Sequence, residues 1–380
     1  MKLLNRRALP AAVLACLTAA TFAACGSSDS DSSATTSRGG AATSADGGGT
    51  GGEKVKMVIS NNFLGNDFRP QMLKLAELTA EQPPFKDVVE LEIVNAENTT
   101  QAQVASINNI IQGRPDVLLV DAGSPTALNP ALKRACAAGI RVISFDQVVT
   151  EPCAWKVAQS HADGQLLVGQ WMDQVLGGSG KILVDRGLPG APVSREIEDA
   201  FMEGLELGGG DVEIAGSFDG KYAPGPEQQG ISQLLVGNRD ARGVMTQGYC
   251  NPAFKAFRQA GISTMPATTC YGYNGELVGC LKERAPCAVL AGPPTVVQIA
   301  MRLGLDAAQG RETPPTSEQV PVPVTLFVTN ADEFRPAENP GNIAIEQIEL
   351  GRNAYEELPP GLALPFSLEE YDISAEQAAG

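Results

Sequence analysis

Short apolar runs alternate with segments of helical periodicity along most of this 380-residue chain. Among the runs are VKMVIS (55–60), DVLLVDAG (116–123) and IRVISFDQ (140–147), and segments such as 66–82 and 100–113 lie between them. Apolar runs of this kind, bounded by turn residues, are typical of strands that are buried on both faces. Strands that alternate with helices pair in parallel, and the helices cover both faces of the sheet. The pattern therefore predicts an α/β protein with doubly wound parallel sheets.

The same alternation continues in the second half of the chain. Further strands are predicted at 181–187, 212–219, 243–248, 262–269 and 287–292, with helical segments between them. The predicted folded part runs from about residue 54 to the end of the 380-residue chain. This length is greater than a single hydrophobic core usually supports. Only 5% of the residues are aromatic, which fits cores built from alanine, valine and leucine. We therefore predict two parallel-sheet lobes.

The N-terminus has the pattern of an export signal. A basic start precedes an apolar, alanine-rich segment (8–24) that is too short for a good membrane span. FAACG (22–26) is similar to a lipoprotein box, in which the cysteine becomes the lipidated first residue, although Phe22 replaces the usual leucine or valine. Ordinary cleavage, with the cysteine incidental, is the alternative. We predict a lipoprotein signal peptide at 1–25, with Cys25 as the lipidation site.

Residues 26–53 have the composition of a flexible tether. The segment is rich in glycine, serine and threonine and contains no aromatic or large aliphatic residue. Such a segment cannot bury enough apolar surface to offset the chain entropy lost on folding. Together with Cys25 it predicts an extracytoplasmic protein, lipid-anchored to the outer face of the cell membrane. The formal net charge of −16 argues against a nucleic-acid partner.

The remaining cysteines indicate disulfides, because an even number in an exported protein favours them. They are Cys136, Cys153, Cys250, Cys270, Cys280 and Cys287. We predict that Cys136 pairs with Cys153, since these two flank one predicted strand and lie far in sequence from the others. The favoured pairs among the other four are Cys250–Cys270 and Cys280–Cys287, but their positions leave the alternative pairings open. No metal site is predicted, because no C-x-x-C occurs and the single histidine, His161, has no partner at metal spacing.

Polar and aromatic residues gather where the predicted strands end, as in SNNF (60–63), SFDQ (144–147) and TQGY (246–249). In open parallel sheets, ligands bind beyond the carboxyl ends of the strands. Amide and carboxylate groups bind hydroxyls, each of which both donates and accepts a hydrogen bond. An aromatic face covers the C–H face of a sugar ring. The strand ends therefore predict a site for a polyhydroxylated small molecule.

Catalytic motifs are not readable in the chain. There is no G-x-S-x-G elbow, and no Ser-His-Asp order is available around the single histidine. GGSGK (177–181) differs from a phosphate-binding loop, because Ile182 follows the lysine and a strand follows the run. We therefore predict that the protein is not an enzyme and uses no cofactor.

Several segments together resemble a known family. They are VKMVISNNFLGNDFRPQM (55–72), VLLVDAGSPTALNPALKRACAAGIRVISFDQ (117–147), GLPGAPVSREIEDAFMEGL (187–205), VLAGPPTVVQIAMRLGLDAAQG (289–310) and VPVPV (320–324). This set is similar to the ribose-binding branch of the type I periplasmic binding proteins, over about 54–328. The resemblance implies a two-lobe sugar receptor that delivers its ligand to an ATP-binding cassette permease.

The resemblance also implies a domain organisation with three crossover strands between the lobes. We expect these crossovers near 158–160, 291–293 and 322–326. The N-terminal lobe is then 54–159 plus 292–323, the C-terminal lobe is 160–291 plus 324–350, and a tail covers 351–380. The sequence leaves open whether the tail packs on the body.

In the first lobe, the resemblance implies ligand contacts at the ends of two strands. Asn66 matches the family's asparagine, Phe68 its stacking aromatic, and Asp146 the aspartate that accepts from sugar hydroxyls. The chain departs from ribose binders at Arg69, where they have a second aromatic, and at Gln147, where an arginine is common. Both residues remain candidates for the site.

In the second lobe, Arg195 matches the family's arginine, and Gln247 lies near its amide position. The remaining candidates of this lobe follow the strands and are Phe218, Asp219 and Asn274. Ala291 stands where ribose binders have a glutamine.

Several of these candidates also have a purely structural interpretation. Asn66 could cap the helix that begins there, and Asp146 could serve a turn. Phe68 could belong to the core, Arg69 could form a structural ion pair, and Arg195 could be a solvated charge on a helix.

The functional hypothesis is a monomeric binding protein that captures a sugar or polyol between two closing lobes and delivers it to an ABC permease. Two alternatives stay open. The receptor could pass its signal to a membrane sensor, or the ligand could be a non-sugar polar solute such as a nucleoside.

Overall fold

The computed structural model describes residues 53–189, 191–311 and 319–379. The predicted signal peptide (1–25), the lipidation site Cys25 and tether residues 26–52 lie outside the described residues. Within the described ranges, no helix has the length and apolar character needed to cross a membrane.

The first sheet has the strand order β11-β5-β4-β3-β1-β2, and all its strands run parallel. Its strands are β1 (Val55–Asn61), β2 (Val89–Asn95), β3 (Val117–Asp121), β4 (Arg141–Phe145), β5 (Trp155–Gln159) and β11 (Gln319–Val322). Its helices are α1 (Phe68–Ala80), α2 (Thr100–Gly113), α3 (Asn129–Ala137) and α9 (Val296–Ala308). We call this sheet and these helices the first lobe.

The second sheet has the order β13-β12-β10-β9-β8-β6-β7. Its strands are β6 (Ser179–Asp185), β7 (Asp211–Phe218), β8 (Ala241–Met245), β9 (Ala267–Tyr271), β10 (Cys287–Ala291), β12 (Thr325–Val328) and β13 (Ala344–Gln347). Its helices are α4 (His161–Leu176), α5 (Pro192–Gly208), α6 (Pro224–Leu235), α7 (Asn251–Gln259) and α8 (Asn274–Glu283). We call this unit the second lobe. The strands from β6 to β10 are parallel, whereas β12 runs antiparallel to β10.

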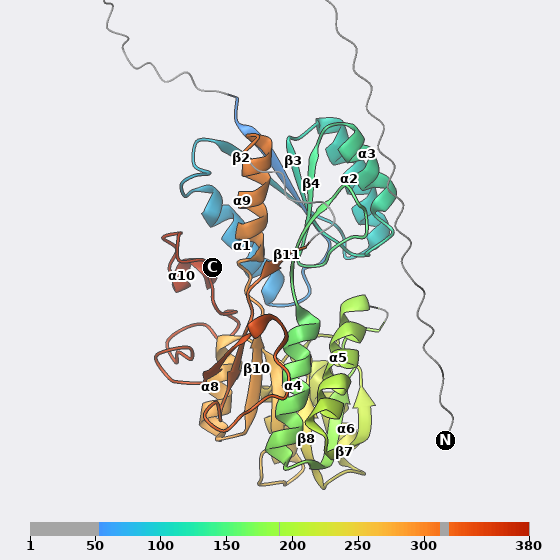
Figure 1. The fold of residues 1–380 in the computed structure, drawn as a ribbon, viewed down its shortest axis with the longest axis vertical. Helices are drawn as coiled ribbons and strands as arrows, with labels where there is room; N and C mark the ends of the chain where they lie inside the picture. Colours follow the sequence, from blue (N-terminus) through green and yellow to red (C-terminus); the bar gives the residue numbers. More distant parts are fainter. Residues whose placement is uncertain (1–52, 190, 312–318, 380) are drawn as a thin grey trace, which may run out of the picture. The chain divides into compact units, whose positions relative to one another are not determined.

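The central strands of each sheet, such as β3 and β10, are buried because helices cover both faces of the sheet (Figure 1). In β3, whose five residues are all buried, Leu119 belongs to the core under α1 and α9, and Leu118 to the core under α2 and α3. In the second sheet, α4 and α5 cover one face and α6 and α7 the other. This arrangement confirms the predicted fold class of two doubly wound parallel-sheet lobes.

In the described ranges, the chain passes between the two sheets at three short segments. It leaves β5 at Gln159 and enters α4 at His161, and it leaves β10 at Ala291 before α9 begins at Val296. The third passage joins β11 to β12 through residues 323–324. Near the second passage, Gln159 donates to the Pro293 carbonyl and Tyr271 donates to the Gly292 carbonyl.

A 3₁₀ turn (Pro340–Asn342) lies between β12 and β13. The C-terminal segment, residues 351–379, follows β13, packs on the body and ends in α10 (Ala375–Ala379). Its buried side chains include Leu362, Leu364, Tyr371 and Ile373, and α10 contacts α1. The segment thus answers, for 351–379, the question of packing that the sequence leaves open.

The largest difference between a predicted strand boundary and the structure is at the start of β9. The sequence predicts a strand over 262–269, but β9 begins only at Ala267, where it pairs with Gly243 of β8. Pro266 precedes it, and proline has no backbone N–H to donate to the neighbouring strand.

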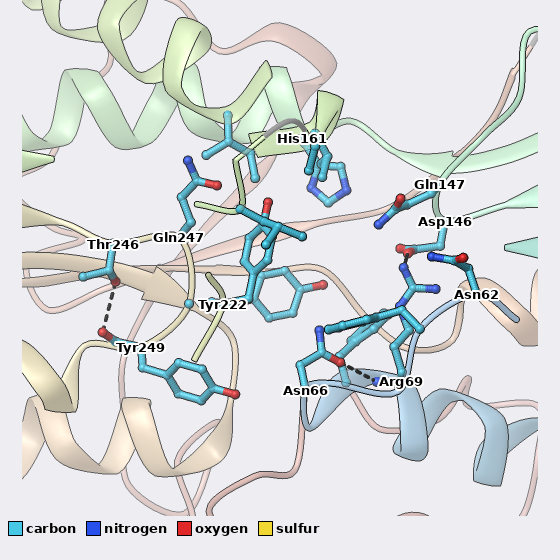
Figure 2. A pocket seen from close by; sticks show the side chains of 18 of the residues that line it. Asn62, Asn66, Arg69, Asp146, Gln147, His161, Tyr222, Thr246, Gln247 and Tyr249 are labelled. Carbon is cyan, nitrogen blue, oxygen red and sulfur yellow. Dashed lines mark hydrogen bonds and ion pairs between the residues drawn. The ribbon is translucent and has the colours of Figure 1, made fainter. Parts of the chain in front are cut away.

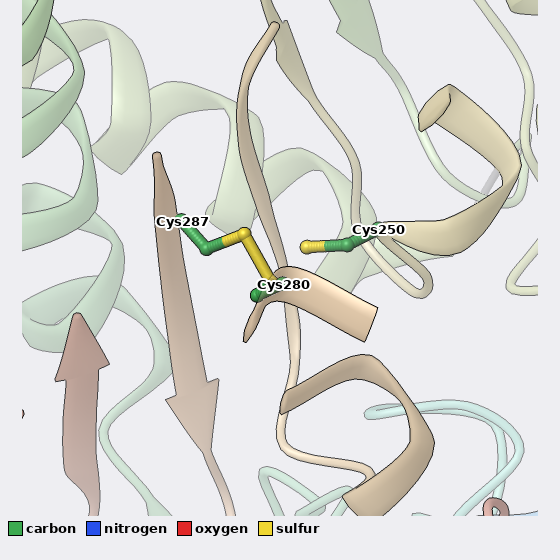
Figure 3. Close-up of side chains that lie close together, drawn as sticks. All are labelled: Cys250, Cys280 and Cys287. Atoms are coloured by element: carbon green, nitrogen blue, oxygen red, sulfur yellow. A yellow bond between two sulfur atoms is a disulfide. The ribbon is translucent and has the colours of Figure 1, made fainter. Parts of the chain in front are cut away.

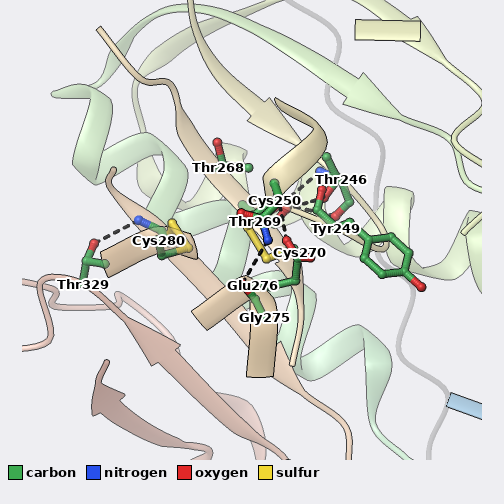
Figure 4. The surroundings of a disulfide bond; sticks show 12 residues. Thr246, Tyr249, Cys250, Thr268, Thr269, Cys270, Gly275, Glu276, Cys280 and Thr329 are labelled. Atoms are coloured by element: carbon green, nitrogen blue, oxygen red, sulfur yellow. Dashed lines mark hydrogen bonds between the residues drawn. A yellow bond between two sulfur atoms is a disulfide. The ribbon is translucent and has the colours of Figure 1, made fainter. Parts of the chain in front are cut away.

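All three favoured disulfides are present. Cys136 is bonded to Cys153, Cys250 to Cys270 and Cys280 to Cys287. The last two lie side by side, and the sulfur of Cys250 is within 4.8 Å of those of Cys280 and Cys287 (Figure 3). The Cys250–Cys270 bond joins the loop after β8 to β9, and Thr246, Thr269 and Glu276 lie around it (Figure 4). The Cys280–Cys287 bond joins α8 to β10. The two groups of potential metal ligands found among the described residues consist of these bonded cysteines and Glu276.

The adjacency of the two bridges generates a prediction about disulfide exchange. In a Cys270→Ser variant, the freed Cys250 thiolate can attack the neighbouring Cys280–Cys287 bond, which releases one thiol and forms a new bond. We expect peptide mapping by mass spectrometry to find Cys250 linked to Cys280 or Cys287.

The matched control is Cys153→Ser, which frees Cys136 in the other lobe and should leave both second-lobe bridges intact. An intact Cys280–Cys287 bond beside a free Cys250 in the Cys270→Ser variant would contradict the prediction.

Candidate functional site

A cavity of about 400 Å³ lies at the carboxyl ends of the strands and is lined by both lobes (Figure 2). The first lobe contributes side chains that follow β1, β2, β3 and β4, together with the first turn of α1. The second lobe contributes residues that follow β6, β7, β8 and β9, and the start of α4. The polar lining residues are Asn62, Asn66, Arg69, Asn98, Thr100, Asp146, Gln147, His161, Gln165, Tyr222, Thr246, Gln247, Tyr249, Tyr271 and Tyr273. The position agrees with the rule for ligand sites in open α/β sheets.

A buried guanidinium organises the first-lobe wall. Arg69 is only 3% exposed and forms ion pairs with Asp121 and, at 2.9 Å, with Asp146. Gln147 accepts from Arg69 at 3.1 Å and donates to the Ala122 carbonyl at 3.0 Å when its amide is oriented to satisfy both neighbours. One arginine therefore fixes the start of α1 against the ends of β3 and β4.

Asn66 and Asp146 each combine a local structural role with a place in the cavity. The Asn66 side-chain oxygen accepts from the Arg69 backbone N–H at 3.0 Å, so it caps the first turn of α1 and leaves its amide nitrogen to donate. Asp146 has a left-handed backbone (φ 57°), which turns the chain directly after β4. The structural and ligand-binding interpretations of these residues are compatible.

An aromatic wall crosses the cavity from one lobe to the other. Phe68 and Tyr271 form a T-shaped pair with a centroid distance of 5.8 Å, Tyr271 lies 5.5 Å from Tyr273, and Tyr273 stacks on Tyr249 at 5.1 Å. The Tyr249 hydroxyl donates to Asp67 of the first lobe at 3.2 Å. With Tyr222, four of the chain's six tyrosines line the cavity. Burial raises the pKa of Tyr222 to about 12, so this hydroxyl keeps its proton at neutral pH.

Gln247 of the second lobe lines the cavity with a side-chain amide that is held in one orientation. Its nitrogen donates to the backbone carbonyls of Asp185 and Ser194 at 3.1 and 3.0 Å, which fixes the side chain. Among the described residues, its buried oxygen has no hydrogen-bond partner, and the same is true of the side-chain oxygens of Asn62 and Gln165. Buried acceptors of this kind are costly unless something donates to them. All three residues line the cavity.

Buried carboxylates hold the loops of the second lobe. Asp185 accepts from the backbone N–H groups of Gly187 and Gly220, and Glu227 accepts from that of Tyr249. Glu276 accepts from the Asn251 N–H at 2.7 Å. Burial raises the pKa of all three groups, that of Glu276 to about 7. These side chains lie behind the loops that carry Gln247 and Tyr249 and hold them in place.

The structure places four predicted site residues away from the cavity. Arg195 lies on the outer face of α5, where its side chain is 84% exposed and pairs with Asp199, because Ser194 and Ile197 occupy the buried face. Phe218 packs in the core under α6, and Asp219 pairs with Arg186 at 2.9 Å. Asn274 is buried and bonds to the C-terminal segment. These four expectations are therefore corrected.

Several lining residues are missing from the sequence-based set. Asn62, Tyr249 and Tyr271 lie directly at strand ends that the sequence identifies, so their positions carried a readable signal. Tyr222 and Gln165 lie further from the strands, and only the packing of α4 and the loop after β7 brings them to the cavity. His161, which has no metal-spaced partner in the sequence, lines the same cavity at the start of α4.

The fold and this cavity define a two-lobed α/β binding protein. The model of the periplasmic binding protein domain family matches residues 57–312, and the chain belongs to this family. The ribose import binding protein RbsB of Bacillus subtilis is 22% identical over 264 residues, which are 68% of this chain and 83% of that protein. The resemblance predicted from the sequence is thereby confirmed.

Solved structures have the same fold. An ABC transporter solute-binding protein from Thermobispora bispora is 26% identical, with a TM-score of 0.65, and the match covers 74% of this chain and 89% of that one. A periplasmic solute-binding protein from Actinobacillus succinogenes, solved with bound D-allose, is 20% identical with a TM-score of 0.64, over 72% and 97% of the two chains.

The buried ion cluster generates a stability prediction. Arg69→Met leaves the carboxylates of Asp121 and Asp146 without their cation, and breaking a buried pair in this way costs about 3–5 kcal/mol. We expect urea unfolding to show a loss of this size. Arg258→Met, which breaks a solvent-accessible pair with Glu283 whose side chains are 50% and 27% exposed, should lower the free energy of unfolding by no more than about 1 kcal/mol. Equal losses in the two variants would contradict the buried role of Arg69.

Glu276 generates a pH prediction. Its folded-state pKa of about 7 lies above the ordinary value of 4.5, so the folded protein binds this proton more tightly than the unfolded chain does. The free energy of unfolding should therefore fall as pH rises from about 4.5 to 7, with a contribution on the order of 3 kcal/mol from this group.

Glu276→Gln removes the titration, so urea unfolding of the variant should show a flatter pH dependence over that range. Asp185 and Glu227 keep their own contributions in the variant, and the slope should decrease without vanishing. An unchanged slope would show that Glu276 does not titrate there.

Proposed function

We propose that the protein is an extracytoplasmic solute-binding lipoprotein that captures a small polyhydroxylated ligand, a monosaccharide or polyol, and delivers it to an ABC importer. One observation carries this proposal: hydrogen-bonding groups from both lobes and a continuous aromatic wall surround a single cavity of about 400 Å³. This volume is in the range of small-molecule sites.

The chemistry of the lining fits hydroxyl groups. Asp146 accepts, the Asn66 amide nitrogen donates, and the unpartnered oxygens of Gln247, Gln165 and Asn62 accept. A sugar hydroxyl can satisfy groups of both kinds at once. Phe68 and Tyr271 offer apolar faces for the C–H side of a ring. The relative solved with D-allose is consistent with a ligand of this class.

The charge balance of the site argues against an anionic ligand. The positive charge of Arg69 is already matched by two carboxylates, Asp121 and Asp146. An acidic sugar would bring a further negative charge to a cluster that has no cation left to receive it.

Capture is proposed to proceed by closure of the lobes. Donors and acceptors that belong to different lobes reach one ligand only when the lobes are close, so the ligand stabilises the closed form. The three passages between the sheets, at Gln159–His161, Ala291–Val296 and 323–324, are the segments in which the backbone would rotate.

The anchor and partners are part of the same proposal. Lipidation at Cys25 and the tether 26–53 would hold a monomeric receptor near the permease at the outer face of the membrane. No nucleic-acid partner is proposed, in keeping with the net charge of −16.

A non-sugar ligand is the second candidate. Four tyrosines around one cavity also offer planar surfaces for a nucleoside base. A ligand panel that contains nucleosides as well as sugars separates the two candidates.

Calorimetric titration with pentoses, hexoses, polyols and nucleosides tests the proposal. We expect a sugar or polyol to bind, and Asp146→Asn to weaken that binding about 10- to 100-fold, because a hydrogen bond to a charged group contributes about 1.5–3 kcal/mol. Arg195→Ala, outside the cavity, should bind as the wild type does. Failure of correctly folded protein to bind any sugar or polyol would refute the proposed ligand class.

A further inference from the structure

We propose that the C-terminal segment 351–379 forms a fourth connection between the lobes and positions the two walls of the cavity. We call this segment the strap. It lies outside the matched family domain, which ends at residue 312. The proposal rests on contacts between the strap and both lobes, and it does not require that the ligand be a sugar.

The strap is fixed to the second lobe through Asn274. The side-chain nitrogen of Asn274 donates to the carbonyls of Tyr355 and Leu358 at 2.8 and 3.0 Å, and its oxygen accepts from the Tyr355 N–H at 2.9 Å. The backbone N–H of Gly275 donates to the Pro360 carbonyl at 2.8 Å. Asn274, which the sequence predicts as a ligand-binding residue, therefore uses its side-chain amide to hold the strap.

The strap is fixed to the first lobe through α1 and α9. Gln71 of α1 makes a reciprocal pair with Ala363: its nitrogen donates to the Ala363 carbonyl at 3.0 Å, and its oxygen accepts from the Ala363 N–H at 2.7 Å. Further along the strap, Gln298 of α9 accepts from the Leu368 N–H at 2.8 Å and donates to the Ser367 hydroxyl at 3.2 Å.

Residues 362–364 bond alternately to the two lobes. The Leu362 carbonyl accepts from the Asn274 N–H at 2.7 Å, and the Leu364 N–H donates to the Gly272 carbonyl at 3.0 Å, both toward the second lobe. Between them, Ala363 directs both of its backbone groups to Gln71 in the first lobe. Successive residues of an extended chain present their polar groups to opposite sides, which permits this arrangement. Ala363 is fully buried and Gln71 is 6% exposed.

These bonds connect two cavity walls over a short path. Gln71 follows Phe68 and Arg69 on α1, and Gly272 and Asn274 flank Tyr273. Tyr273 and Ala363 also form an isolated antiparallel β-bridge. A change in lobe separation must therefore rotate residues 362–364 or break their bonds. Gln71 is accordingly a positioning residue that acts on the cavity through the strap.

Gly361 allows the strap to approach Asp67 of the first lobe closely. A side chain on Gly361 would meet the carboxylate of Asp67, with its Cβ 3.2–3.3 Å from the carboxylate atoms. Asp67 is also the acceptor for the Tyr249 hydroxyl of the second lobe. The strap thus lies against the direct contact between the lobes.

Hydrogen exchange of the full chain without ligand tests the proposal. Gln71→Ala leaves the Ala363 N–H and carbonyl without their partners. We expect roughly tenfold faster amide exchange both in 66–73 of the first lobe and in 271–276 of the second, because buried groups left without partners make local opening easier. Small-angle scattering should show a wider spread of lobe separations.

The matched control is Asn353→Ala. Within the part of the chain that the structure describes, Asn353 bonds only to the nearby backbone, at the Glu349 N–H and the Gln347 carbonyl. Its removal should leave exchange in 66–73 unchanged. Faster exchange confined to α1 in Gln71→Ala, or the same cross-lobe effect in Asn353→Ala, would overturn the proposal.

A second variant changes the contact between the strap and the second lobe. It provides the test if Gln71→Ala does not fold. Asn274→Asp keeps the acceptor for the Tyr355 N–H and loses the bonds that the amide nitrogen donates to the carbonyls of Tyr355, Leu358 and Pro359. This variant should accelerate amide exchange in 66–73 of the first lobe. A change limited to the second lobe would overturn the proposal. Because none of these measurements uses a ligand, absence of sugar binding would refute the proposed function and leave this test intact.

Discussion

The guanidinium of Arg69 is the interaction on which the first half of the site depends. It joins the first turn of α1 to Asp121 at the end of β3 and to Asp146 after β4. Parallel strands bring these ends to the same edge of the sheet, but the edge alone would place two buried carboxylates side by side without compensation. The arginine removes that conflict and also fixes the helix turn that carries Asn66 and Phe68. The ion cluster and the cavity wall are therefore one structure.

The second lobe solves the same problem by a different route. Buried carboxylates, Asp185, Glu227 and Glu276, accept hydrogen bonds from the backbone N–H groups of the loops after β6, β7 and β8. This leaves side chains such as Gln247 and Tyr249 directed to the cavity. One lobe thus uses a paired cation and the other uses backbone donors, and the aromatic wall from Phe68 to Tyr249 joins them.

The sequence predicted the architecture well because hydrophobic periodicity depends mainly on local burial. Alternating strands and helices, the cysteine pairs and the strand-end position of Asp146 and Gln247 all follow from short-range pattern or from family resemblance. The second-lobe candidates were less accurate. Whether Arg195 or Ser194 faces inward depends on the rotation of α5, and the role of Asn274 depends on the strap more than 80 residues away. The strap itself has little periodicity, so the sequence left its packing open.

A crystal structure of the protein with the ligand selected by titration would show which groups of the cavity bind it. We expect a neutral polyhydroxylated molecule in the cavity, with its ring against Phe68 or Tyr271 and its hydroxyls bonded to Asp146 of one lobe and Gln247 of the other. A ligand that contacts one lobe alone, or that occupies a different place on the molecule, would contradict this expectation.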